Sequence, residues 1–175
     1  MASFRALRAG LRSEPVKWVE EDNIHITLKF FGETEESLIP VISATIEKIA
    51  QNSPELKFRL SGTGIFGSSY KPRVIWAGIE PHEQLAELMK TFVKEMEQFG
   101  FEPDRQNLVP HLTLGRIKFI KDKLLFNRLI DANSKIQSEP ITVGECVLYE
   151  SILGREGPRY VVLGTFSLGN KNGRF

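Results

Sequence analysis

The chain has 175 residues, of which 41% are hydrophobic and 26% charged, and its formal net charge at pH 7 is +1. This balance predicts one globular domain or two small lobes that share a core. It argues against a protein that wraps long nucleic acid, because wrapping needs many Lys and Arg contacts with phosphates. The apolar runs are too short to span a bilayer, no signal segment opens the chain, and the single cysteine, Cys146, excludes an intramolecular disulfide and a cysteine cluster for zinc. We therefore expect a cytosolic protein.

In the first half of the chain, hydrophobic periodicity and turn residues predict two helices and two strands. In chain order, the prediction is a short amphipathic helix over 2–12, a polar connection over 14–21, a strand over 24–30, a helix over 34–51 and a strand over 56–60. The strand over 24–30 alternates apolar residues with His25, Thr27 and Lys29. Glycine and serine residues then predict a loop from Gly62 to Pro72.

The second half is predicted to form strands and helices in alternation, followed by a hairpin. Its elements are an apolar, central strand over 73–79, a helix from Pro81 to a stop at Gly100, a strand that begins at His111, a helix over 122–132 and strands over 141–149 and 159–168. The order helix, His-containing strand, helix, strand occurs in both halves, which indicates an internal duplication. The first copy lacks the strand that would precede its His-containing strand. Either that strand lies before Met1, or the C-terminal hairpin covers the exposed sheet edge.

One short motif occurs twice, as His25-Ile26-Thr27-Leu28 and His111-Leu112-Thr113-Leu114, and it uses two of the three histidines. Because successive side chains of a strand point to opposite faces, the His and Thr of each motif share one face, towards a cleft or water. A single motif of this kind is ordinary in a half-exposed strand. From the composition of this chain, however, the chance of finding the pair is on the order of one in ten thousand, so we interpret the pair as functional.

Charged residues near the motifs supply further candidates. Arg116 follows the second motif but shares the parity of its buried leucines, which would direct a charge into the core. We hypothesise a bulge or twist at Gly115 that turns Arg116 towards the cleft. Lys29 shares the parity of His25, so it either approaches the group that the His and Thr side chains bind or ends a strand in water.

The basic groupings in the sequence are Lys71 with Arg73, the run Arg116, Lys118, Lys121 and Lys123, and Arg155 with Arg159. Each can hold one or a few phosphates, although a solvated surface is the commoner explanation for such a run. Phe30 is expected to lie in the core rather than to serve as a base-stacking surface. The loop from Gly62 lacks the G-x-x-x-x-G-K-[ST] pattern and is not interpreted as a nucleotide cradle.

Both motifs and their surroundings resemble the two-histidine (2H) phosphoesterase superfamily, in particular the bacterial and archaeal RNA 2′,3′-cyclic phosphodiesterases, also called tRNA 2′-5′ ligases. The resemblance covers most of the chain, through Trp18-Val19, Asn23 to Gly32, Pro72 to Gly78, Pro110 to Arg116 and Leu148 to Ser151. It implies an α+β fold that is bilobal, with two antiparallel sheets related by a pseudo-twofold axis, helices on the outside and a central cleft. Residues 1–175 would then form a single domain with duplicated lobes, roughly 1–61 and 73–150, and a C-terminal hairpin strand, 159–168.

Hydrolysis of a cyclic phosphodiester needs a base that deprotonates water, an acid that protonates the leaving ribose oxygen, and donors for the phosphoryl oxygens. Two histidines suit the first two tasks, because an imidazole pKa of about 6.5 allows one neutral and one charged ring near neutrality, without a metal or another cofactor. The resemblance implies that His25 is the proton donor and His111 the proton acceptor. The candidate groups for binding the phosphate are Thr27, Thr113, Arg116 and Lys29.

The predicted function is metal-independent hydrolysis of RNA ends that carry a 2′,3′-cyclic phosphate. If water attacks and the 3′ oxygen leaves, the product is a 2′-phosphate, and the same constellation with a ribose 5′-hydroxyl as the opposing group would form a 2′-5′ linkage. We expect a monomer whose partner is RNA, or a related nucleotide, and not a membrane. Two alternatives stay open: the same site acting on 2′-5′ oligonucleotides or nucleotide cyclic phosphates, and a non-catalytic module that binds RNA ends.

Overall fold

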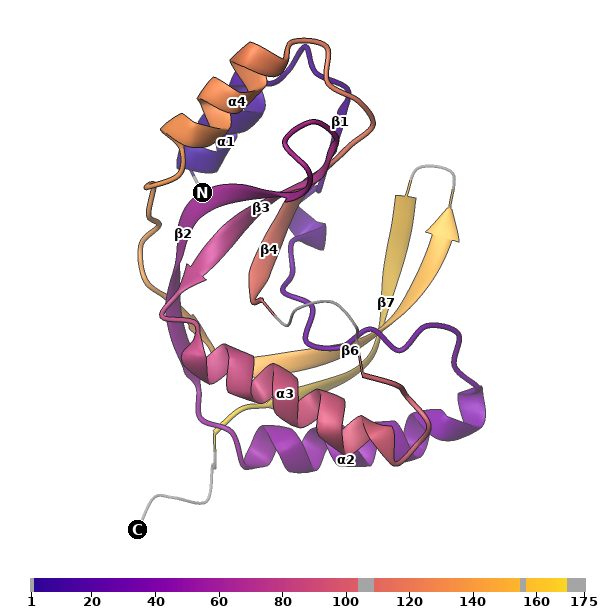
Figure 1. The fold of residues 1–175 in the computed structure, drawn as a ribbon. Coiled ribbons are helices and arrows are strands. Elements are labelled where there is room, and N and C mark those ends of the chain that lie inside the picture. Colours follow the sequence, from indigo (N-terminus) through magenta and orange to yellow (C-terminus); the bar gives the residue numbers. More distant parts are fainter. Residues whose placement is uncertain (1, 104–108, 155–156, 170–175) are drawn as a thin grey trace. The chain divides into compact units, whose positions relative to one another are not determined.

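The computed structural model describes residues 2–103, 109–154 and 157–169 (Figure 1), so Arg155 of the third basic grouping lies outside the described residues. The chain divides into two compact units, each assembled from three segments. Unit 1 comprises residues 1–27, 58–82 and 110–141, and unit 2 comprises residues 28–57, 83–109 and 142–175. Each unit therefore draws on both halves of the sequence, and the His and Thr of both motifs belong to unit 1.

A five-stranded sheet has the strand order β1-β4-β3-β2-β5. Its strands are β1 Val16–Trp18, β2 Leu56–Gly67, β3 Pro72–Glu80, β4 His111–Ile117 and β5 Ile141–Val143. The apolar strand predicted over 73–79 corresponds to β3, and its central position is confirmed. The strand predicted from His111 corresponds to β4, which pairs antiparallel with both β1 and β3.

Unit 1 also contains two helices, α1 Ala2–Gly10 and α4 Lys123–Ala132, which contact each other beside this sheet (Figure 1). They supply Leu7 and Phe126, each 1% exposed, to an apolar core. The sheet supplies Ile75, Ala77 and Leu112, none more than 5% exposed. The helices predicted over 2–12 and 122–132 are thus confirmed, and their burial of apolar area stabilises one face of the sheet.

The β2–β3 hairpin corrects the loop that was predicted over 62–72. β2 continues to Gly67, and only residues 68–71 form the turn. A Cβ atom added to Gly64 of β2 would lie 2.2 Å from a ring carbon of Trp76 on β3. β2 therefore needs glycine at this position. Glycine here marks a close side-chain approach within a strand rather than a loop.

Two predictions around the first motif are wrong. Residues 24–30 form no strand in the structure, and they follow the short 3-10 helix η1 Glu21–Asn23. The predicted connection over 14–21 instead contains β1, which lies at the edge of the sheet beside β4. The physical reason is that apolar alternation reports a half-buried segment, whereas a strand also requires a partner with free backbone groups.

Unit 2 packs helices against a hairpin. Its elements are η2 Glu36–Leu38, α2 Ile39–Gln51, α3 Glu83–Glu97, β6 Glu145–Gly154 and β7 Gly157–Ser167. α2 contacts α3, β6 and β7, and the core of this unit includes Ile46, Phe92 and Phe166, none more than 7% exposed. The predicted helices and the C-terminal hairpin are confirmed. Within the described residues, β6 and β7 form a separate two-stranded sheet, so the hairpin does not extend the sheet that contains β4.

The described part of the chain is therefore a mixed α/β fold with antiparallel strand pairs and four α-helices. This agrees with the α and β content and the antiparallel pairing expected from the sequence. Among the residues that the structure describes, no helix is both long enough and apolar enough to cross a membrane.

Candidate active site

The second His-x-Thr motif lies on β4, between β1 and β3. The register with β3 pairs His111 with Gly78, Thr113 with Trp76 and Arg116 with Val74. Directly paired residues share a face of an antiparallel sheet, and these three β3 residues alternate with the buried Ile75 and Ala77. His111, Thr113 and Arg116 therefore lie on one face of the sheet, opposite the buried face, and we call it the His face.

A β-bulge explains why Arg116 reaches the His face. The adjacent β3 residues Ile75 and Trp76 pair with Gly115 and Thr113, respectively. Leu114 is therefore an extra residue, and it reverses the alternation of the side chains that follow it. The bulge hypothesised at Gly115 is confirmed, with the unpaired residue one position earlier. Arg116 is exposed rather than buried, as the hypothesis required.

Two aromatic rings stand beside His111. The Phe66 ring centroid lies 4.7 Å from that of the His111 imidazole, with an interplanar angle of 86°, and 5.4 Å from that of Trp76. Phe66 pairs with Val74 and therefore belongs to the His face, where it is 36% exposed. Edge-to-face contacts of this kind favour one orientation of the rings, so Phe66 restrains the imidazole of His111.

The first motif is placed by its connection to β4. β1 runs antiparallel to β4, towards the end at which His111 lies, and the Val19 N–H donates to the Leu114 carbonyl at 2.9 Å. η1 follows, and His25 and Thr27 come directly after it, both exposed. The ring nitrogen Nδ1 of His25 bonds to the Asn23 backbone oxygen at 2.8 Å. A carbonyl only accepts, so Nδ1 carries the proton in this bond.

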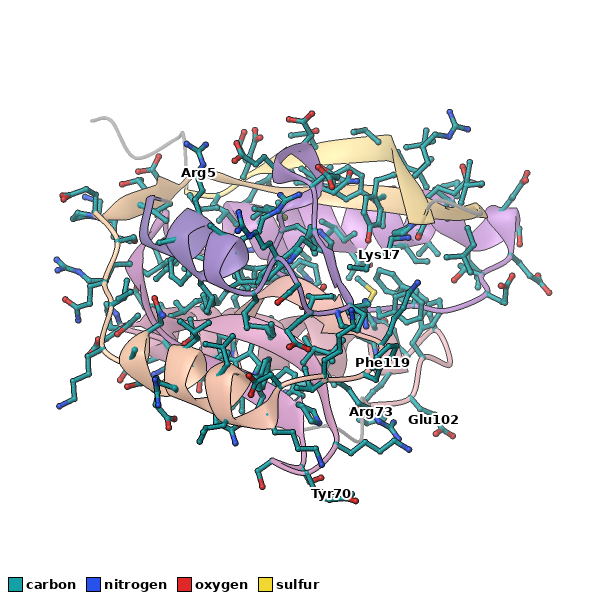
Figure 2. All side chains as sticks on the ribbon, turned by 90° about the horizontal axis from the view of Figure 1, so that it is seen from above. Arg5, Lys17, Tyr70, Arg73, Glu102 and Phe119 are labelled. Atoms are coloured by element: carbon teal, nitrogen blue, oxygen red, sulfur yellow. The ribbon has the colours of Figure 1, made fainter. Side chains whose placement is uncertain are left out.

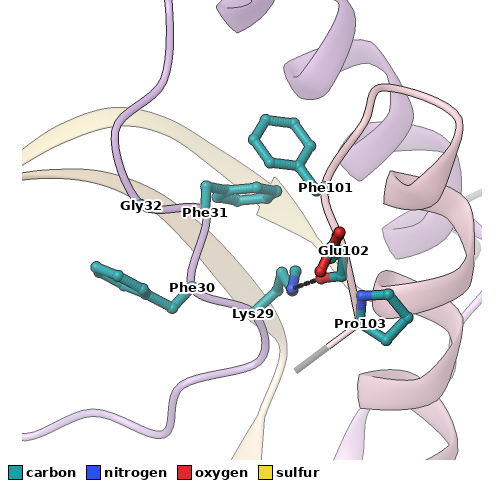
Figure 3. Close-up of a pocket in the computed structure, with 7 residues that line it drawn as sticks. All are labelled: Lys29, Phe30, Phe31, Gly32, Phe101, Glu102 and Pro103. Atoms are coloured by element: carbon teal, nitrogen blue, oxygen red, sulfur yellow. Dashed lines mark hydrogen bonds between the residues drawn. The ribbon is translucent and has the colours of Figure 1, made fainter. Parts of the chain in front are cut away.

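Lys29 lies in unit 2, in a shallow pocket that Figure 3 shows in close-up. Its Nζ donates to the backbone oxygen of Glu102 at 2.8 Å, and the pocket is lined by Lys29, Phe30, Phe31, Gly32, Phe101, Glu102 and Pro103. Phe31 and Phe101 pack edge to face, with ring centroids 5.0 Å apart. Phe30 is 67% exposed, so the prediction that it lies in the core is wrong: without a strand over 24–30, alternation no longer directs it inwards.

Sequence reasoning missed three residues of the His face: Phe66, Trp76 and Lys17, which pairs with Arg116 across β1 and β4. Alternation along β3 carried a signal for Trp76, because this residue has the parity opposite to Ile75 and Ala77. Phe66 was hidden by the loop predicted over 62–72. Lys17 was missed because β1 is only three residues long, which is too short for its alternation to identify a strand.

The fold is shared with several solved structures. A structure described as a phosphoesterase is 24% identical, with a TM-score of 0.70 over 97% of this chain and 93% of that one. The structure of TT0787 of Thermus thermophilus has a TM-score of 0.78 at 26% identity, over 95% of this chain and 90% of that one. E. coli LigT in its apo form has a TM-score of 0.70 at 24% identity, over 97% and 92% of the two chains.

The comparison of sequences identifies the family. The family model described as the 2′-5′ RNA ligase superfamily matches residues 2–150, and this chain belongs to that superfamily. A relative from Thermotoga maritima named RNA 2′,3′-cyclic phosphodiesterase is 35% identical over 83% of this chain and 76% of its own length. A relative of the same name from Methanothermobacter thermautotrophicus is 32% identical over 87% and 83% of the two chains. The family resemblance stated from the two motifs is therefore confirmed.

Proposed function

We propose that this protein hydrolyses RNA 2′,3′-cyclic phosphate ends by acid–base catalysis with His25 and His111. The single observation that carries the proposal is the His face of β4, on which an imidazole, a hydroxyl and a guanidinium are presented together by His111, Thr113 and Arg116. The names of the Thermotoga and Methanothermobacter relatives support the substrate class. The antiparallel path of β1 supports the approach of His25 towards the His111 end of β4.

In the proposed mechanism, His111 accepts a proton from the water that attacks phosphorus. The bond to the 3′ oxygen breaks, and His25 donates a proton from Nε2 to that leaving oxygen, so that a 2′-phosphate forms. The backbone oxygen of Asn23 holds the proton on Nδ1, which fixes the ring for this task. With a ribose 5′-hydroxyl in place of water as the attacking group, the same steps form a 2′-5′ linkage: the 5′ oxygen bonds to phosphorus and loses its proton to His111, and the 3′ oxygen leaves with a proton from His25.

Three polar groups are proposed to bind the phosphoryl oxygens. The hydroxyls of Thr27 and Thr113 donate one hydrogen bond each, and the guanidinium of Arg116 supplies a charge-assisted donor pair. Lys29 is the weakest candidate for this role, because its ammonium donates to the Glu102 carbonyl in unit 2.

We also propose that residues 1–175 act as one domain made of duplicated lobes related by a pseudo-twofold axis. The repeated His-x-Thr motif supports this interpretation, since each half of the sequence contributes one acid–base residue. A monomer located in the cytoplasm is the proposed working form, because the single Cys146 and an RNA substrate both fit a reducing compartment that contains RNA.

The test is an assay with a short oligoribonucleotide that ends in a 2′,3′-cyclic phosphate, with EDTA present. We expect turnover to a 2′-phosphate, a bell-shaped pH profile, and a loss of about 10²–10⁴-fold in kcat for His25→Ala and for His111→Ala. His82→Ala is the matched control, because His82 is the third histidine and is exposed just before α3. Near wild-type activity of His111→Ala would reject the mechanism.

The same assay separates the alternatives. If 2′-5′ oligoadenylate or a nucleoside 2′,3′-cyclic phosphate is turned over faster than the cyclic-phosphate oligonucleotide, that compound is the better substrate of the same site. Binding of the RNA end without any turnover would favour the non-catalytic module.

A further inference from the structure

We propose that unit 1 carries a surface that binds the single-stranded RNA chain preceding the reacting nucleotide, so that the preferred substrate is an oligonucleotide. This inference rests on the proposed function, which places the RNA end on the His face. The surface, which we call the basic–aromatic surface, consists of Tyr70, Lys71, Arg73, Lys118, Phe119, Lys121 and Lys123. All of these side chains are exposed.

The fold brings together two basic groupings that are separate in the sequence. β2 ends, β3 begins and β4 ends at the same end of the sheet, because consecutive neighbours in the order β4-β3-β2 are antiparallel. The β2–β3 turn and the β4–α4 connection therefore lie at one end. Their contact is direct, since Nζ of Lys123 stands 3.8 Å from the centroid of the Tyr70 ring.

The β4–α4 connection is held in place by its backbone. The Lys118 N–H donates to the Pro15 carbonyl at 3.0 Å. The carboxylate of Glu14, only 6% exposed, accepts the N–H groups of Lys121 and Asp122 at 2.7 and 3.0 Å. The segment thus presents its cationic side chains from a fixed backbone, which limits the ordering cost of binding a ligand.

The acidic groups of this connection are engaged with the backbone. Glu14 accepts the two N–H groups described above, and the side chain of Asp122 accepts the N–H of Leu125 at 2.9 Å as the N-cap of α4. Both carboxylates therefore satisfy main-chain donors. The lysine ammonium groups of the same segment are available to phosphates at the surface.

Large aromatic side chains alternate with these cations. Tyr70 is 78% and Phe119 59% exposed. Figure 2 labels Tyr70, which belongs to the β2–β3 turn, and Arg73, the second residue of β3. Cationic groups that follow a phosphate backbone, combined with aromatic rings on which bases stack, are the features by which proteins bind single-stranded RNA. Binding of an isolated phosphate needs the cations but no aromatic ring, and a mononucleotide offers only one base to the two exposed rings.

The basic–aromatic surface is continuous with the His face. Arg116 lies on that face and precedes Lys118 by two positions in the sequence, and Val74, the partner of Arg116, follows Arg73. On the neighbouring strand, Phe66 contacts His111 and β2 then leads into the turn that contains Tyr70. His111 begins β4 and the basic–aromatic surface lies where β4 ends, so an RNA chain with its terminal phosphate at His111 and its preceding phosphates on this surface runs along the His face past Thr113 and Arg116.

The test compares wild type with the variant Lys71→Gln/Lys118→Gln/Lys123→Gln. We measure kcat/KM for a cyclic-phosphate-terminated 8-mer and for a nucleoside 2′,3′-cyclic phosphate, and the Kd of a labelled 8-mer that ends in a 2′-phosphate. For the 8-mer we expect kcat/KM to fall and Kd to rise by about tenfold or more, with the salt slope of log Kd reduced by about 2. Turnover of the mononucleotide should change less than about twofold, because none of these lysines touches the reacting phosphate.

The matched control is Lys48→Gln/Lys94→Gln, which removes exposed charges from α2 and α3 of unit 2 and should leave the 8-mer Kd within about twofold of wild type. A second variant, Tyr70→Ala, removes a stacking ring without removing a charge. It should raise the Kd and lower the kcat/KM of the 8-mer and leave turnover of the mononucleotide unchanged. Equal losses for 8-mer and mononucleotide, or no loss for either, would overturn the proposal. If wild type turns over neither substrate, the proposed function fails, and the Kd values still decide whether this surface binds RNA.

Discussion

The imidazole of His111 is restrained by Phe66, whose ring meets it edge to face at 4.7 Å. We predict that Phe66→Ala lowers kcat on the cyclic-phosphate oligonucleotide by about tenfold, because an imidazole that has lost this edge-to-face contact is held less firmly in a productive orientation. KM should change little, and Phe66→Leu should restore part of kcat by refilling the volume. A rise in KM with kcat unchanged would instead indicate that Phe66 only binds substrate.

Burial determines the chemistry of Cys146. Desolvation in the core of unit 2 raises the pKa of its thiol from 9.0 to about 11, with smaller contributions from Glu47 and Glu145 in the same direction. The neutral thiol is thus favoured in the folded state. The stability that this provides is fully present below pH 9 and is lost as the pH rises through about 11, because the unfolded chain ionises first.

We predict accordingly that Cys146 resists alkylation at about pH 8 until the protein unfolds, since the thiolate is the reactive form. The measurement is labelling by iodoacetamide with and without urea, read by mass spectrometry. Stability measured by urea denaturation should also fall less steeply between pH 9 and about 11 in Cys146→Ala than in wild type. Rapid labelling of the native protein would contradict the buried position.

At the scale of elements, the glycines of β2 set the packing of the His face. A Cβ on Gly64 would approach the Trp76 ring to 2.2 Å, whereas one on Gly144 would come no closer than 3.4 Å to the Glu55 side chain. We predict that Gly64→Ala lowers the free energy of unfolding by about 1–3 kcal/mol, the usual cost of overpacking, while Gly144→Ala is nearly neutral. Urea denaturation of both variants measures the difference, and equal stability of the two would refute this account of the hairpin.

The same glycines show why the sequence described some elements better than others. The helices and β3 were predictable because their apolar residues recur with a clear period and bury one face. The loop over 62–72 was mispredicted because Gly64 looks like a turn residue until the Trp76 ring that occupies its place is known. The segment 24–30 was predicted as a strand and β1 as part of a connection, and both predictions are wrong. Strand formation depends on a partner, here β4, that lies far away in the sequence.

The residues of the candidate site also fall into those that could be predicted from the sequence and those that could not. His25, His111 and their threonines were identified from the repeated motif, and Arg116 from the argument that a charge does not enter the core, which correctly required a bulge. Phe66 and Lys17 could not be found, because their place on the His face depends on the registers of β2 and β1. Local patterns thus identify the chemistry, whereas tertiary register determines which further side chains accompany it.

At the scale of the whole molecule, the central expectation is that two histidines from opposite halves of the sequence act in one step on one phosphate. Groups that act as a unit give non-additive losses, because removing the second costs little once the first has gone. We therefore predict that His25→Ala/His111→Ala loses far less kcat than the product of the two single losses.

His82→Ala combined with His111→Ala should match His111→Ala alone, since the proposed mechanism gives His82 no part in the reaction. The measurement is single-turnover hydrolysis of the cyclic-phosphate 8-mer by all variants. Losses that multiply would show that the two histidines act in separate steps or on separate groups, and the shared acid–base mechanism would then have to be abandoned.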